Sequence, residues 1–139
     1  MIDAPTTMKT LLAAQWTAAN TDGITPNIDI VLDASAPYAM MKDSIFTYSI
    51  TYTTEPNGIG TANKTTEELV SIDARSRGTR AHMIKVISEV ERILDKNMIN
   101  PATGYDALMP LRSKDLSDRS KKLGRFVFDC RLSQLTTSR

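Results

Sequence analysis

The chain has 139 residues, 41% of them hydrophobic and 24% charged, which is an ordinary globular composition, so we expect a single domain over residues 1–139. The net charge of +1 argues against strong attraction to nucleic acid, and any such role would have to come from a local patch. The lone Cys130 excludes an intramolecular disulfide. No apolar run reaches the roughly eighteen residues of a membrane span, and residues 1–5 show no secretory signal.

The first two predicted elements are a helix and a strand near a sheet edge. The helix covers residues 6–20, with Thr6 or Thr7 as its cap and Gly23 in the left-handed position after its last turn. The strand covers residues 27–33, where apolar side chains alternate with polar ones and leave one face mainly polar.

The clearest strand signal covers residues 45–54. Aromatic and aliphatic side chains alternate there with serine and threonine, and we assign to the core the side that carries Phe46, Tyr48, Ile50 and Tyr52. Residues 55–66 follow, with the turn signal Pro-Asn-Gly and few core residues. They predict a mobile hairpin tip, longer than the roughly two to five residues of a usual hairpin loop and suited to contact with a partner.

A short strand over residues 69–74 leads into the longest helical pattern, residues 79–96. Six apolar residues recur at helical spacing and form one stripe, which must pack on the sheet: Met83, Val86, Ile87, Val90, Ile93 and Leu94. Five polar residues fall outside the stripe, where we expect them to face water: His82, Lys85, Glu89, Arg92 and Lys96.

The last third of the chain predicts one weak strand and one strong strand. The helix ends near Asn97, residues 107–109 form a short strand, and residues 114–124 form a polar loop. In the final strand, residues 125–135, one side is apolar, and residues 136–139 form a frayed tail. The apolar side carries Phe126, Phe128, Cys130 and Leu132. The whole pattern predicts an α+β fold with a mainly antiparallel sheet of about four strands packed against two helices.

No constellation of residues predicts catalysis, a metal site or a cofactor site. His82 is the only histidine, and neither a serine nor Cys130 stands at a spacing that would pair with it, so a boundary histidine and a buried thiol are the simpler interpretations. Asp29, Asp33 and Asp73 could meet across a sheet and hold magnesium, but solvated carboxylates at strand ends are more common. We therefore expect a protein without enzymatic activity.

Two basic groups are harder to explain by folding alone. One stands at the start of the second helix: Arg75, Arg77 and Arg80. The other precedes the last strand: Arg112, Lys114, Arg119, Lys121, Lys122 and Arg125. The simpler interpretation is a solvated surface, and the sharper one is a polar contact surface for protein or nucleic-acid phosphate. Because arginines oppose the dipole at a helix N-terminus, the first group favours an intermolecular partner.

The element order and several local patterns resemble the tail terminator (tail completion) proteins of tailed viruses. These patterns are Val-Ser-Ile-Asp-Ala-Arg at residues 70–75, Arg-Ala-His at 80–82 and Val-Glu-Arg-Ile-Leu at 90–94. The segment from Trp16 through Asn-Thr-Asp-Gly-Ile-Thr-Pro at residues 20–26 looks like small structural proteins of archaeal tailed viruses in particular. The late Asp-Leu-Ser and the closing strand also fit.

This resemblance implies a virion component of the tail and neck, assembled in the host cytoplasm. Such proteins form a ring, commonly a hexamer, on the end of the tail tube, where they stop tube polymerisation and present a surface for head attachment. The implied partners are further copies of the chain, the tail tube protein and a head-completion or connector protein. DNA would pass through the lumen without being read, and no membrane is involved. The candidate contact residues are Pro56, Asn57, Gly58, Ile59, Lys64, Arg75, Arg77, Arg80, Lys114, Arg119, Lys121 and Lys122.

Three other functions remain open. A head–tail connector or neck adaptor shares the same context and the same composition. A small nucleic-acid-binding protein would use the basic loop and show a steep salt dependence. A metal-dependent enzyme is the third alternative.

Overall fold

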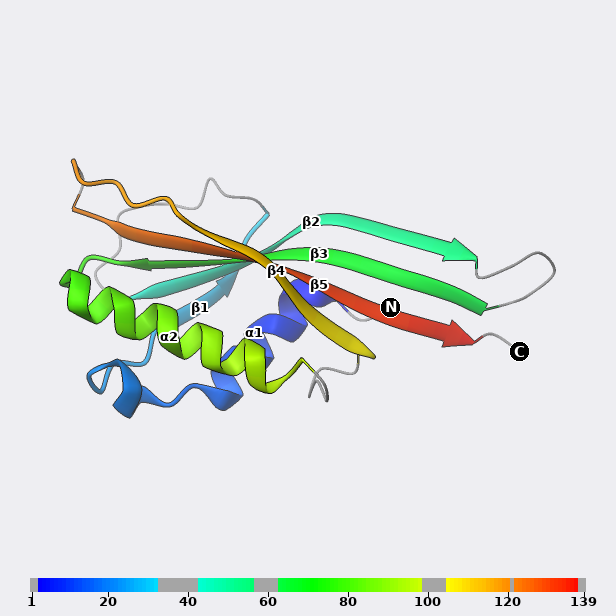
Figure 1. The fold of residues 1–139 in the computed structure, drawn as a ribbon, viewed down its shortest axis with the longest axis horizontal. Helices are drawn as coiled ribbons and strands as arrows, with labels where there is room; N and C mark the ends of the chain where they lie inside the picture. Colours follow the sequence, from blue (N-terminus) through cyan, green and yellow to red (C-terminus); the bar gives the residue numbers. More distant parts are fainter. Residues whose placement is uncertain (1–2, 33–42, 57–62, 99–104, 121, 138–139) are drawn as a thin grey trace.

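The computed structural model describes residues 3–32, 43–56, 63–98, 105–120 and 122–137. It is a five-stranded sheet with two helices on one face (Figure 1). The elements in chain order are α1 (Ala4–Gln15), the 3₁₀ turn η1 (Ala18–Thr21), β1 (Asn27–Ile30), β2 (Ser44–Pro56), β3 (Asn63–Ser76), α2 (Arg80–Lys96), β4 (Ala107–Asp115) and β5 (Gly124–Thr137). The predicted α+β class is confirmed, with five strands in place of about four.

The sheet has the order β1-β2-β3-β5-β4, and every neighbouring pair except one is antiparallel. The exception is the short β1, which runs parallel to the first residues of β2 at one edge. The expected edge position of this segment is confirmed, although the strand ends at Ile30. No helix within the described ranges is long and apolar enough to cross a membrane.

The core lies between the helices and the face of the sheet that they cover. The apolar stripe of α2 packs against Val70, Ile72, Phe128 and Cys130, as its spacing predicts. Thr79 caps this helix by accepting a hydrogen bond from the backbone N–H of His82 at 3.2 Å. The helix ends at Lys96, with Asn97 as its C-cap, also as predicted.

The first helix begins earlier than its pattern predicts. It starts at Ala4, because Pro5 suits the first helical turn, where its missing N–H costs nothing. Thr6 and Thr7 therefore lie inside the helix and are not its cap. The helix stops at Gln15, and Gly23 then adopts the predicted left-handed conformation, with φ +78°.

The aromatic side of β2 does not face the helices, which corrects our assignment. Ile45 enters the core, and the Thr47 hydroxyl donates to the carbonyl of Pro5 at 2.9 Å, so these two residues face α1. Phe46 and Tyr48 lie on the opposite face. A register shift between Ser49 and Thr51 then ends the simple alternation. A period of two marks both faces of a strand, and it does not say which one the helices cover.

The hairpin between β2 and β3 is longer, and its tip shorter, than predicted. Pro56 pairs with Lys64, so only residues 57–62 separate the two strands, and the predicted contact residues Asn57, Gly58 and Ile59 lie outside the described part of the chain. At the other edge, Lys114 lies within β4 instead of a loop, because the strand continues past Pro110 through a register shift. β5 extends to Thr137, into the predicted tail.

Candidate functional site

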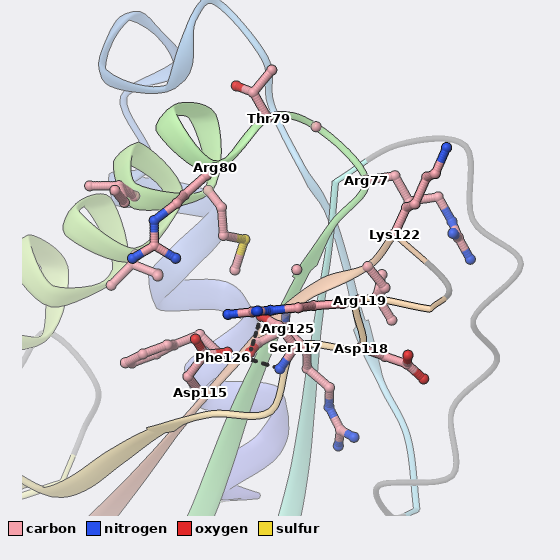
Figure 2. A pocket seen from close by; sticks show the side chains of 16 residues that line it. Arg77, Thr79, Arg80, Asp115, Ser117, Asp118, Arg119, Lys122, Arg125 and Phe126 are labelled. Atoms are coloured by element: carbon pink, nitrogen blue, oxygen red, sulfur yellow. Dashed lines mark hydrogen bonds between the residues drawn. The ribbon is translucent and has the colours of Figure 1, made fainter.

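A groove of about 800 Å³ contains residues from both predicted basic groups. It runs between the N-terminal half of α2 and the hairpin that joins β4 to β5 (Figure 2). Its cationic lining residues are Arg77, Arg80, Arg119, Lys122 and Arg125, and its acidic ones are Asp115 and Asp118. The two groups are about forty residues apart in the sequence, and antiparallel pairing places them on facing walls.

The base of this groove is apolar. Met83, Ile84 and Ile87 project from α2, while Leu123 and Phe126 come from the hairpin and β5. Ile84 is half exposed, although it lies on a helix with a complete core stripe. Exposed apolar surface framed by charge is typical of protein contact sites.

The hairpin tip is a tight turn that sets the positions of its charged side chains. Asp118 and Leu123 exchange two backbone hydrogen bonds of 2.9 and 3.0 Å, and Lys122 adopts a left-handed conformation with φ 51°. The Asp118 carboxylate accepts hydrogen bonds from the backbone and hydroxyl of Ser120. In Figure 2, Arg80 extends from α2 and Arg119 from the hairpin into the space between them.

Three of the five cationic residues that line the groove have no acidic ion-pair partner among the described residues. Among the described residues, Arg80, Arg119 and Lys122 form no ion pair within 4 Å, and all three are exposed. The pKa of Asp115 is lowered, first by hydrogen bonds from Ser117 and then by the charges of Arg80 and Arg119. The Asp115 carboxylate therefore lies close to positive charges. The groove has more cations than acids, so it can bind an acidic ligand.

Arg75 is not a contact residue, contrary to our prediction. Its side chain is fully buried on the sheet face opposite the helices, donates to Asp73 at 3.0 and 3.2 Å, and lies 4.9 Å from the centre of the Phe46 ring. Arg125 also bonds Asp73, at 2.8 Å. Burial alone would raise the pKa of Asp73, but the hydrogen bonds from the two arginines hold it below its usual value.

The cluster of Asp73, Arg75 and Arg125 argues against a magnesium site among the residues that the structure describes. Both Asp73 oxygens are used by arginines, and Phe46 stands between Asp29 and Asp73 in the sheet register. No cluster of three metal-ligating residues exists among the residues described. Asp33 lies outside these ranges.

His82 is buried, so our expectation that water reaches it is wrong. Its Nδ1 lies 2.7 Å from a carboxylate oxygen of Asp22, and its Nε2 lies 2.5 Å from one of Asp43. Burial would lower the pKa of this imidazole, but the two carboxylates raise it. Asp43 also accepts a hydrogen bond from Ser76 at 2.6 Å. This cluster of His82, Asp22, Asp43 and Ser76 therefore joins four segments of the chain, and the serine hydroxyl is directed at Asp43 and not at the imidazole.

Glu89 is the second polar residue of α2 that the sequence placed in water and the structure buries. It accepts hydrogen bonds from the backbone N–H of Thr17 at 2.6 Å, from Asn20 at 3.1 Å and from Arg92 at 2.6 Å. Arg92 first, and then Thr17 and Asn20, lower its pKa to about 2 against the cost of burial. The sequence pattern of α2 does not reveal this burial, because it depends on η1, which packs against α2 only in the folded chain.

The other candidate residues that the structure describes do not line the groove. Lys114 is exposed on β4 and lies on the opposite face of the sheet, in register with Val127. Pro56 and Lys64 lie at the far end of the β2–β3 hairpin, and Lys121 lies outside the described residues. The thiol of Cys130 is buried, and burial raises its pKa to about 12, as expected for an inert cysteine.

Comparison with known proteins gives a fold relative and no sequence relative. No protein-family model and no curated protein sequence matches the chain. One matching solved structure is a chain described as "Virion of native gene transfer agent (GTA) particle". That chain is 11% identical, with a TM-score of 0.53, and the alignment covers 96% of this chain and 95% of the other. The likeness shows that the fold described above recurs, from end to end, in that chain.

Proposed function

We propose that this chain is a structural virion protein, a tail terminator that forms a ring on the tail tube, ends tube polymerisation and joins the tail to the head. The observation that carries the proposal is the end-to-end fold likeness to a chain of a gene transfer agent virion. The alignment that supports it covers 96% of this chain and 95% of that chain.

The groove supports a role in assembly over a role in chemistry. Its lining residues combine apolar side chains, among them the half-exposed Ile84, with the exposed cations Arg80, Arg119 and Lys122, which suits a macromolecular partner. Three buried groups outside it whose pKa values are shifted, Asp73, His82 and Glu89, are paired with other groups and hold elements of the fold together. The proposed role is therefore non-enzymatic, with further copies of the chain, the tube protein and a head-completion protein as partners.

The test is the mass of the purified protein by light scattering, followed by negative-stain electron microscopy with and without tail tube protein. We expect closed rings, hexameric in mass, and tubes that carry a ring at one end and stop growing. A protein that stays monomeric at high concentration, both alone and with tube protein, would refute the proposal.

The connector or neck adaptor is distinguished by the same imaging. Rings that bind a head-side connector and leave tube growth unaffected would assign the chain to that class. A nucleic-acid-binding role predicts tight, steeply salt-dependent association with DNA, whereas we expect only weak association.

A further inference from the structure

The three central strands form an arm at the end of the molecule opposite the groove. In Figure 1, β2, β3 and β5 project beyond both helices, while the start of α2 and the β4–β5 hairpin lie at the other end. We define the arm as residues 49–56 of β2 with residues 63–69 of β3 and 131–137 of β5. Two different surfaces at opposite ends of one subunit are the requirement for head-to-tail assembly.

The outer edge of the arm has free backbone groups. β1 pairs only with Ser44–Thr47, so within the described residues no strand pairs with the outer edge of β2 from Ser49 to Pro56, on the side away from β3. Ile50 and Tyr52 on this stretch are 44% and 46% exposed. A long exposed edge with apolar side chains is a surface that proteins either protect or use for association.

The arm also carries two glutamates that form no ion pair among the described residues. Glu55 on β2 and Glu67 on β3 are both exposed and occupy diagonal positions on one face, since Glu55 pairs with Thr65 and Glu67 with Thr53. Neither forms an ion pair among the described residues. The β2 side of the arm therefore presents apolar and acidic groups, although the arm as a whole also contains Lys64 and Arg131, whereas the groove has more cations than acids.

We propose that the β2 edge of the arm of one copy occupies the α2–hairpin groove of the next copy. Ile50 and Tyr52 then cover the exposed apolar base near Ile84, and Glu55 and Glu67 face Arg80 and Arg119. The contact is heterologous, because arm and groove are different surfaces, and a constant rotation between copies closes it into a ring. This inference rests on the proposed function, which requires self-association, and it names the two surfaces that meet.

The occupant is a protein strand and not a nucleic acid, for two reasons. The base of the groove is apolar, and no phosphate backbone gains from covering it. Asp115 and Asp118 stand among the cations and would repel phosphates, whereas the N–H groups of an unpaired strand edge can donate to carboxylates.

The test is charge reversal on each surface separately. The arm variant is Glu55→Arg with Glu67→Arg, the groove variant is Arg80→Glu with Arg119→Glu, and both change only exposed side chains. We expect each variant alone to lose the ring-sized species in light scattering, because like charges then meet. A 1:1 mixture should recover it, since the arm of each variant is complementary to the groove of the other.

A matched control reverses exposed charges elsewhere, Glu91→Arg and Lys114→Glu, and should assemble as the wild type does. Rings that persist in the groove variant, or a mixture that does not recover them, would overturn this inference and leave the proposed ring intact. A wild-type protein that never associates, with or without tube protein, would overturn both.

Discussion

Three buried charged residues of this molecule and two exposed arginines of its groove differ in whether they have ion-pair or hydrogen-bond partners among the described residues. Asp73, Glu89 and His82 are buried, and each bonds at least two groups from other positions in the chain. Arg80 and Arg119 are exposed, and neither has an ion-pair partner among the described residues. The first set holds the fold together, and the second set is available to another molecule.

Removing the Asp73 carboxylate should be the most damaging single change. In Asp73→Ala, the buried Arg75 and the nearly buried Arg125 keep their charges and lose their common acceptor. Breaking a buried pair in this way costs about 3–5 kcal/mol of unfolding free energy. Urea unfolding followed by circular dichroism measures the loss, with Lys114→Ala, an exposed cation in the same row of the sheet, as the control. A loss below about 1 kcal/mol would mean that the cluster is not structural.

Glu89→Gln should cost about 1–3 kcal/mol, because the charge-assisted bonds that tie η1 to α2 are weakened. The free energy of unfolding of the wild type should also decrease at acidic pH, because the carboxylate of Glu89 becomes protonated. The folded-state pKa of Glu89, about 2, lies below its ordinary value of 4.5, so its contribution is full above pH 4.5 and is lost as the pH falls toward 2.

Urea unfolding at a series of pH values from 6 to 2 measures this effect. The difference between wild type and Glu89→Gln should shrink as the solution is acidified. Glu91→Gln, an exposed neighbour on the same helix, is the control and should behave as the wild type. A difference that does not depend on pH would contradict the assigned role of this carboxylate.

His82 should lose its structural role on the alkaline side. Asp22 and Asp43 raise the pKa of the imidazole above 6.5, so it stabilises the fold while protonated and ceases to do so as the pH rises through the raised value. Lys85, which bonds Asp22, is the other charge in this cluster. Because His82 is the only histidine, its imidazole NMR signals can be titrated without assignment, and a midpoint at or below 6.5 would contradict this interpretation.

The sequence predicted the secondary structure better than it predicted which residues lie inside. The stripe of α2 and the alternation of β5 were read correctly, because each buries one continuous apolar face. The aromatic side of β2 was assigned to the wrong layer, since Phe46 and Tyr48 cover an ion cluster on the other face. Local periodicity describes a single element, whereas the layer depends on where the other elements pack.

The candidate site was only partly predicted, because local sequence does not show where the other elements pack. Arginines at the start of α2 and cations before β5 were singled out, and the groove contains five of them, Arg77, Arg80, Arg119, Lys122 and Arg125. Arg75 was grouped with them by proximity in sequence, but it is the last but one residue of β3 and points to the opposite face. The burial of Glu89 could not be read locally, because its ligands come from Thr17 and Asn20, about seventy residues away.

The smallest effect on stability should come from the groove itself. Arg80→Ala and Arg119→Ala remove exposed cations that have no ion-pair partner in the described chain, so each should change the unfolding free energy by less than about 0.5 kcal/mol. The same variants should weaken self-association in light scattering, and added salt should reproduce this effect in the wild type, since exposed charges are screened. If these two arginines instead stabilise the fold, the variants would lose stability and their assembly would not change. Comparing both measurements on the same two variants therefore decides whether the groove is part of the scaffold or a surface for the next subunit.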